Sequence, residues 1–244
     1  MRKEKPYQVV YEDNHLLIVN KAPGVLVQGD ITGDESLTDL LKNYLKVKYN
    51  KPGEVFLNSV HRLDRPVSGL VVFARTSKAL ERMNALFRKR EIQKTYWAVV
   101  GRRPQVKEGK LVHWLVKDER KNVVTAYDRE VAQSQKAELN YRWLGEINKF
   151  HLLEVSPITG RPHQIRVQLA QMGCPIRGDV KYGYSRYNPG NNINLHARRL
   201  FFEHPVRKEP VLCRAGLPND PFWEEFLTLD PEEIKPEHLK FLYE

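Results

Sequence analysis

Four polar or charged residues stand together in "HRLDRPVSG", residues 61–69, directly before the apolar run "LVVFAR". Such side chains lose solvation when buried, whereas a loop at the end of a buried strand can aim them at a ligand. Asp64 lies between Arg62 and Arg65, and cations on both sides favour its ionised form. An ionised aspartate can be a nucleophile, a general base or a metal ligand, although its positive neighbours disfavour a metal. The structural alternative is an Asp–Arg turn.

A second polar cluster lies in "TGRPHQIR", residues 159–166. The spacing predicts a helix with Pro162 at its first position, so that Arg161 and His163 lie near an N-terminus that favours anions. Arg166 follows about one turn later, beside the apolar stripe of that helix. A buried guanidinium needs a carboxylate, and we expect Arg166 to pair with Asp64. A solvated basic face is the alternative, more convincing for Arg161 than for Arg166.

A third candidate is Tyr96 in "KTYWAVVG", residues 94–101, which has the pattern of a strand. Alternation places Tyr96 on the face opposite Trp97, where its phenol could serve as an acid, a base or a stacking surface. A core tyrosine with a satisfied hydroxyl is the alternative. The chain contains no GxGxxG dinucleotide loop, P-loop, HExxH or GxSxG motif.

The elements that must position these residues are strands and helices without the strict alternation of a doubly wound fold, which favours a mixed α+β class. Strands are expected as a pair within 9–28 with a turn at 12–14, and over 69–76, 94–101 and 149–157. Helices are expected over 36–49, 77–92 and from 162 to a Gly173 cap, with Ser36 and either Thr76 or Ser77 as N-caps. Residues 101–142 are weakly periodic and predict exposed hairpins or loops.

The composition bounds the class of protein. The 244 residues are 41% hydrophobic, and no apolar run approaches the roughly 18 residues that a membrane span needs. The N-terminus lacks the apolar region of a signal peptide, so we expect a cytoplasmic protein that does not enter a membrane. Cys174 and Cys213 have no partner spacing for a disulfide framework or a zinc site.

Charge points toward a polyanionic partner. The formal net charge is +10, and residues 81–121 hold 12 Lys and Arg against 5 Asp and Glu. A basic sector of this kind favours nucleic acid, while an ordinary basic enzyme with solvated lysines is the alternative.

Five segments together resemble the RluA-type RNA pseudouridine synthases, and they cover most of the chain. In chain order they are "VVYEDNHLLIVNKAPGVLV", "HRLDRPVSGLVVFARTSKAL", "KTYWAVV", "SPITGRPHQIRVQLAQMGCPIRGDVKYG" and "LHARRLFFEHPV". The resemblance implies a pseudouridine synthase fold, with a mixed, mostly antiparallel sheet, flanking helices and a central RNA-binding cleft. It also implies isomerisation of a specific uridine in tRNA or rRNA after base flipping, without cofactor, metal or ATP.

The resemblance assigns roles residue by residue. Asp64 matches the nucleophile, Tyr96 the tyrosine that stacks on the target base and is proposed to take the C5 proton, and Arg166 the arginine paired with the aspartate. Arg62 matches the residue thought to enter the RNA stack, and Leu195 is the candidate for the apolar residue that packs the pocket. Further RNA contacts are expected from Arg65, Arg161 and His163.

Two departures from the family pattern make the assignment to one subfamily less specific. Pro66 and Val67 stand where the family often has an acidic residue or Glu-Thr, and Pro162 stands where Thr is usual. "HRLDRP" is similar to the tRNA-modifying branch, and the chain starts on the catalytic domain without the S4-type domain of many relatives, so tRNA is favoured over rRNA.

We expect one catalytic domain over 1–227 and an acidic tail over 228–244, packed on the body. A monomer without an obligate protein partner is the default. The rival functions are a non-catalytic RNA-binding module on the same fold and a hydrolase that uses Asp64 as a general base. The hydrolase would usually need a second carboxylate or a metal, and none stands near the motifs.

Overall fold

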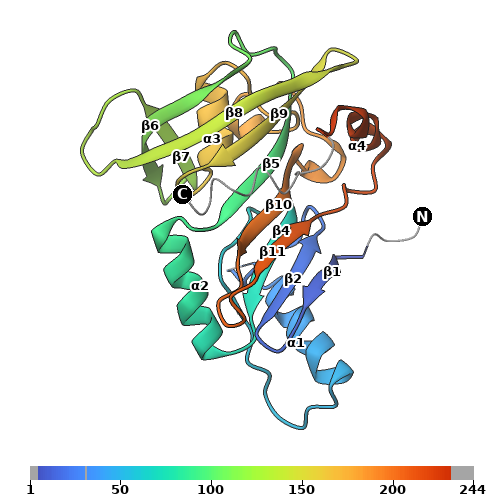
Figure 1. Ribbon diagram of the computed structural model, residues 1–244. Helices are drawn as coiled ribbons and strands as arrows, with labels where there is room; N and C mark the ends of the chain where they lie inside the picture. Colours follow the sequence, from blue (N-terminus) through green and yellow to red (C-terminus); the bar gives the residue numbers. More distant parts are fainter. Residues whose placement is uncertain (1–4, 31, 232–244) are drawn as a thin grey trace.

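Eleven strands form one continuous sheet within residues 5–30 and 32–231, the part of the chain that this computed structural model describes (Figure 1). The elements in chain order are β1 (Tyr7–Glu12), β2 (Leu16–Lys21), α1 (Leu37–Lys48), β3 (Asn58–Ser59), β4 (Ser68–Ala74), α2 (Ser77–Lys89), β5 (Gln93–Val100), β6 (Glu108–Asp118), β7 (Val123–Tyr127), β8 (Gln135–Ile147), β9 (Phe150–Pro157), α3 (Gln164–Gln171), the 3-10 helices η1 (Val180–Tyr182) and η2 (Pro189–Asn191), β10 (Leu195–Glu203), β11 (Pro210–Arg214), α4 (Pro221–Glu224) and the 3-10 helix η3 (Glu225–Leu229).

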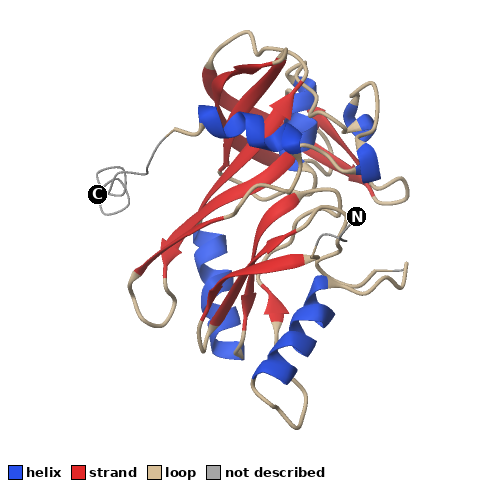
Figure 2. Ribbon diagram, turned by 90° about the vertical axis from the view of Figure 1, so that its right-hand side faces the viewer, coloured by secondary structure: helices blue, strands red, loops and turns tan. Residues whose placement is uncertain are grey.

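The sheet is mixed and mostly antiparallel, which confirms the predicted α+β class. Its order is β1-β2-β4-β10-β5-β9-β8-β6-β7, with β11 added to β10 and β3 to β4. Among the described strands, β4 and β10 form the one parallel pair. The strands twist from β1 to β7, so that β1, β2 and β4 lie in one half of the molecule and β6 to β9 in the other (Figures 1 and 2).

Helices cover both faces of the sheet because both faces are apolar. One face packs against α1 and α3 in the largest core cluster, which includes Leu41 and Leu169. The other face packs against α2 through Met83, and against α4 and η3 through Trp223 and Phe226. Helices α1 and α2 each bury one apolar face on the sheet, as expected of an amphipathic helix, whereas α3 is buried from Gln164 to Leu169, its polar residues included.

The parallel junction of β4 and β10 requires a glycine. Gly69 pairs with Ala197, has a φ of 114°, and a Cβ at this position would lie 2.4–2.7 Å from backbone atoms of Ala197. An L side chain would be strained by the dihedral angle and would also clash. Gly69 therefore lets the strand that follows the "HRLDRPVS" loop reach the centre of the sheet.

Most local predictions are confirmed. The strand pair over 9–28 turns at Asp13, whose side chain accepts hydrogen bonds from the backbone of His15 and Leu16 at 2.8 and 2.7 Å. Ser36 is the N-cap of α1 in a capping box, and Thr76 caps α2. Gly173 has a φ of 84° directly after the C-cap of α3, as expected of a helix-ending glycine.

Two local predictions are wrong. Pro162 is not the first residue of a helix, because α3 begins at Gln164 after His163, which has a left-handed φ of 52°. The Gln164 side chain accepts hydrogen bonds from the Thr159 hydroxyl and the Arg161 backbone, and so stabilises a separate turn before the helix. Residues 101–142 are not merely protruding hairpins, because β6, β7 and β8 continue the central sheet.

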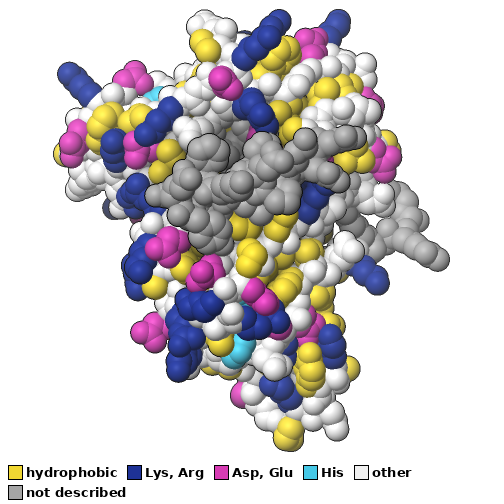
Figure 3. Space-filling view, in the orientation of Figure 1, with side chains coloured by type: hydrophobic (Ala, Val, Ile, Leu, Met, Phe, Trp, Pro, Cys, Tyr) yellow, Lys and Arg dark blue, Asp and Glu magenta, His cyan; other side chains and the backbone are white. Residues whose placement is uncertain are grey.

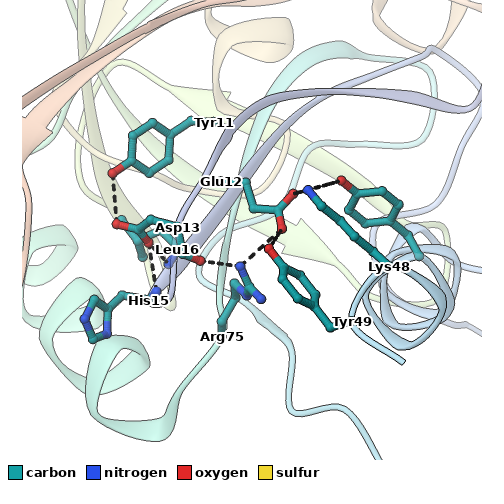
Figure 4. Close-up of polar contacts among 9 residues, drawn as sticks. Tyr11, Glu12, Asp13, His15, Leu16, Lys48, Tyr49 and Arg75 are labelled. Carbon is teal, nitrogen blue, oxygen red and sulfur yellow. Dashed lines mark hydrogen bonds and ion pairs between the residues drawn. The ribbon is translucent and has the colours of Figure 1, made fainter. Parts of the chain in front are cut away.

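Polar contacts tie the β1–β2 hairpin to the end of α1 and to β4 (Figure 4). Glu12 accepts hydrogen bonds from Lys48 at 2.8 Å and Tyr49 at 2.6 Å, and pairs with Arg75 at 3.3 Å. Arg75 also donates to the carbonyl of Asp13. The edge hairpin is therefore fixed to the rest of the sheet by a partly buried carboxylate.

The segment after β11 returns to the sheet. Asp230 pairs with Arg198 at 2.9 Å and also with Arg199 and Arg214. Residues 232–244 of the predicted acidic tail lie outside the described residues.

On the face that Figure 3 shows, Lys and Arg side chains are dispersed with Asp and Glu among them. No helix of the described residues is long and apolar enough to cross a membrane.

Candidate active site

The loop of residues 60–67 is fastened to its neighbours through its backbone. The carbonyl of Arg65 accepts hydrogen bonds from the backbone of Gly24 at 2.8 Å and from Lys21 Nζ at 3.2 Å, and the carbonyl of Pro66 accepts one from Ile193 at 3.2 Å. Residues 21–24 and Ile193 thus fasten the loop that carries Asp64, and the Asp64 side chain is 28% exposed.

Lys21 is a buried cation beneath this loop. Its side chain is fully buried and donates to the carbonyls of Ala22 at 3.0 Å, Val25 at 2.9 Å and Arg65. Burial lowers the pKa of Lys21 to about 7, and the nearby charge of Asp64 acts in the opposite direction. Three carbonyl acceptors match the three N–H groups of an ammonium ion, so Lys21 holds the backbone of the loop from within the core.

Arg166 joins two carboxylates from distant parts of the chain. It donates to Asp64 through Nη1 at 2.8 Å, and to Asp179 through Nε at 2.7 Å and Nη2 at 2.8 Å. The predicted pair with Asp64 is therefore present, and Asp179 holds the same guanidinium in the two-pronged geometry that suits arginine. The two aspartates raise the pKa of Arg166 against the opposing effect of its burial.

His163 and Tyr182 complete the wall beside Asp64. His163 Nδ1 lies 2.6 Å from the Tyr182 hydroxyl, and its Nε2 lies 3.8 Å from Asp64 Oδ2. The Tyr182 ring also lies 5.0 Å below the Arg166 guanidinium. Burial lowers the pKa of His163, while the charge of Asp64 opposes this effect, so the ring is neutral near pH 7.

One hollow, here called the Tyr96 pocket, contains most of the predicted site residues. Its volume is about 380 Å³, and Asp64, Tyr96, Leu195 and Arg166 all line it. Leu195 is buried and provides an apolar wall. The Tyr96 pocket thus combines a carboxylate, an aromatic ring and an apolar wall, which suits a flat polar ring that must be held during covalent chemistry.

Tyr96 is protonated at neutral pH. Burial raises its pKa above the ordinary value for tyrosine, and the negative charge of Asp64 raises it further. The phenol is therefore an O–H donor and a stacking surface, and it is not a base while Asp64 is charged.

A second hollow, here called the Tyr187 groove, adjoins the Tyr96 pocket at Asp64. Its volume is about 670 Å³, and its lining includes the predicted RNA-contacting residues Arg62, Arg65, Arg161 and His163, of which all but Arg65 also line the Tyr96 pocket. Arg62 borders both hollows and makes no hydrogen bond or ion pair with any other described residue. Arg65 is instead engaged with Gly24 at 3.0 Å and Asp34 at 2.7 Å. Arg161 donates to the carbonyl of Lys136 at 3.2 Å.

Sequence reasoning missed three residues of this site. Asp179 lies in "RGDVKYG" without a pattern of its own, Lys21 sits in a strand that otherwise predicts a core, and Lys94 lines the Tyr96 pocket. Lys94 could have been found, because it lies two residues before Tyr96 on the same strand face.

A larger hollow of about 1060 Å³ between α1 and the β1–β2 hairpin contains none of the predicted site residues.

The chain is similar to several known proteins. The family model described as RNA pseudouridylate synthase matches residues 15–171. The chain is 31% identical to "tRNA pseudouridine synthase C" of Vibrio cholerae, over 91% of this chain and 94% of that protein. It is 33% identical to "Ribosomal large subunit pseudouridine synthase C" of the same organism, over 88% of this chain and 67% of that protein. The structure is similar to "Human RNA Pseudouridylate Synthase Domain Containing 4", with a TM-score of 0.74, 26% identity, and coverage of 91% and 92% of the two chains.

Proposed function

Since this chain belongs to the RNA pseudouridylate synthase family, we propose that it isomerises a specific uridine of a structured RNA with Asp64 as its nucleophile. Family membership gives the reaction, the conversion of uridine to pseudouridine in RNA, and makes the chain an enzyme. Nothing in the comparisons supports the alternative of a non-catalytic RNA-binding module.

The observation that supports Asp64 as the nucleophile is its position in the Tyr96 pocket, where Arg166 donates a hydrogen bond to it at 2.8 Å. In the reaction, an Asp64 oxygen attacks either the sugar or the base. The bond from C1′ to N1 breaks, the uracil turns, and a bond from C1′ to C5 forms. The carboxylate is released, C5 loses its proton, and N1 gains one. No other reactant is needed.

Tyr96 has two successive roles in this proposal. First its ring stacks on the uracil and keeps the detached base inside the pocket. Burial, the larger cause of its raised pKa, keeps the phenol protonated, and the charge of Asp64 adds to this effect until Asp64 forms a covalent bond. In the last step the phenol gives its own proton to N1 and takes the proton that C5 loses, so that the two transfers balance.

Base flipping delivers the uridine to Asp64. A uridine stacked in folded RNA cannot reach the Tyr96 pocket, and its extrusion costs a few kcal/mol. Arg62 is exposed at the border of both hollows and has no partner among the described residues, so it is free to occupy the gap that the uridine leaves. Leu195 then packs the flipped base, while Arg65, Arg161 and His163 border the path of the RNA strand.

A tRNA is the proposed substrate in preference to rRNA. The support is the "HRLDRP" segment and the match to the Vibrio cholerae protein named as a tRNA pseudouridine synthase, which extends over 94% of that protein. We further propose that residues 1–227 are the catalytic domain, that residues 228–244 pack on it, and that the protein acts as a cytoplasmic monomer. The basic sector 81–121 would contact phosphates, which makes RNA binding weaken with salt.

The test is carbodiimide-based mapping of pseudouridine in total tRNA and rRNA from cells with and without the gene. Complementation uses wild type, Asp64→Asn and the matched control Asp128→Asn, since Asp128 is an exposed aspartate remote from the pocket. We expect one modified uridine to vanish and to return with wild type and with Asp128→Asn only.

Purified proteins and unmodified transcripts complete the test. Asp64→Asn is expected to fold normally and to have no turnover. Activity of Asp64→Asn above a few per cent would remove Asp64 from the nucleophile role. If a single rRNA site vanished instead of a tRNA site, the proposed substrate would be wrong and the proposed reaction would stand.

A further inference from the structure

We propose that the Tyr187 groove is a second nucleotide subsite, in which Tyr187 stacks on the base of a nucleotide next to the flipped uridine. This inference rests on the proposed function, because it places the flipped uridine in the Tyr96 pocket. Asp64 borders both hollows, so the Tyr187 groove lies next to the pocket that takes the uridine and can hold a neighbouring nucleotide.

Tyr187 is an exposed aromatic side chain at the groove. It is 63% exposed and makes no hydrogen bond, ion pair or ring contact with another residue in the described ranges. Exposed tyrosines are common and usually need no explanation. This one differs because it lines the same hollow as Asp64 and Arg62, where a ring face is available to a ligand.

The loop that carries Tyr187 is fastened to its neighbours at the next residue. The neighbouring Asn188 side chain donates to Asn194 Oδ1 at 2.7 Å and to the carbonyl of Arg177 at 3.4 Å. Asn188 also occupies the space beside Gly178, where a Cβ would lie 2.4 Å from Asn188 Nδ2. A base can therefore stack on a ring whose backbone is already ordered, and such preorganisation lowers the cost of binding.

The remaining lining suits a nucleotide. Leu26 and Ile193 give the groove an apolar part on which a base can lie. Arg62, Arg161 and Lys181 add cations within reach of a phosphate. Three carboxylates also line the groove: Asp64 and Asp179 are paired with Arg166, and Asp30 accepts a hydrogen bond from the backbone of Thr32 at 2.8 Å. Aromatic stacking combined with cations along the backbone is the usual way in which proteins hold single-stranded nucleotides.

The test compares wild type with Tyr187→Ala, Tyr187→Phe and the control Tyr127→Ala, since Tyr127 is also exposed, at 40%, and lies on β7 outside both hollows. The substrate is an unmodified transcript of the stem–loop that loses its pseudouridine in cells without the gene. We expect Tyr187→Ala to raise KM about 5- to 100-fold, the effect of removing one base–aromatic stack, with kcat within about twofold. Tyr187→Phe keeps a stacking ring and is expected to stay within about threefold of wild type.

Fluorescence gives a readout that a purely structural role would not change. The same transcript carries 2-aminopurine at the nucleotide before or after the target uridine and is bound to Asp64→Asn, which holds RNA without turnover. We expect quenching at one of these positions, and loss of that quenching when Tyr187→Ala is added. The subsite would be overturned if Tyr187→Ala had the same kinetics and quenching as Tyr127→Ala. It would also be overturned if Tyr187→Phe raised KM as much as Tyr187→Ala. If wild type formed no pseudouridine, the proposed function would be refuted instead. The quenching experiment would still show whether a base stacks on Tyr187.

Discussion

Replacement of Arg166 by methionine is expected to destabilise the protein mainly through Asp179, although Arg166 binds two aspartates. The Asp179 side chain is 1% exposed, whereas that of Asp64 is 28% exposed. Without the guanidinium, Asp64 can recover solvent, and Asp179 stays buried as an uncompensated charge. Loss of one partner of a buried pair costs about 3–5 kcal/mol, which raises the unfolding equilibrium constant by a factor of about 10² to 4 × 10³.

The assay is a double-mutant cycle measured by urea unfolding with tryptophan fluorescence. Asp179→Asn is expected to lower stability in the wild-type background and to raise it by about 2 kcal/mol in Arg166→Met, because it removes the stranded charge. Asp64→Asn is the matched control, since it removes the other carboxylate of the same arginine. In the Arg166→Met background it is expected to change the unfolding free energy by less than about 1 kcal/mol.

Additive losses from Arg166→Met and Asp179→Asn would refute this reasoning, because they would mean that Asp179 is stabilised by something other than Arg166. An equal effect of Asp64→Asn and Asp179→Asn would refute it as well, since burial would then not distinguish the two carboxylates. Turnover is expected to be lost in Arg166→Met and to remain lost in the double mutant, because neither restores the orientation of Asp64.

Three further outcomes are expected. Burial lowers the pKa values of His61 and His196 to about 3, so the unfolded state takes up protons first as the pH falls below about 6.5. Each of the two histidines is expected to lower the unfolding free energy by about 2 kcal/mol between pH 7 and pH 5, and urea unfolding that gives equal stability at the two pH values would contradict this. Gly69→Ala is expected to cost several kcal/mol of unfolding free energy, since a Cβ would lie 2.4 Å from the backbone of Ala197, whereas Gly29→Ala, with no atom within 4 Å, is expected to change stability by less than about 1 kcal/mol in the same assay. Arg62→Ala is expected to slow pseudouridine formation more in a structured stem–loop than in a flexible single-stranded RNA, and equal losses on both would exclude a role in filling the gap left by the flipped base.

Local patterns in the sequence determined the elements and the chemical groups of this site. Alternation predicted the strand that carries Tyr96, and the Ser36 and Thr76 caps marked two helix starts, because such signals depend on neighbours within one or two turns. The pair of Asp64 and Arg166 was also within reach of the sequence, since a guanidinium beside an apolar helix stripe requires a carboxylate and one stood in the other polar motif.

Only the tertiary structure decided how these groups are supported. Asp179 has no pattern that points to Arg166, and Lys21 lies in an apolar strand whose burial under the Asp64 loop depends on the order of β2, β4 and β10. The same holds for the start of α3, where the Gln164 side chain donates to the distant carbonyl of Glu138 at 3.0 Å and the helix begins at Gln164 despite the preference of Pro162 for a first helical position. A sequence pattern records what a residue prefers, and packing against residues far away in the chain decides which partner it meets.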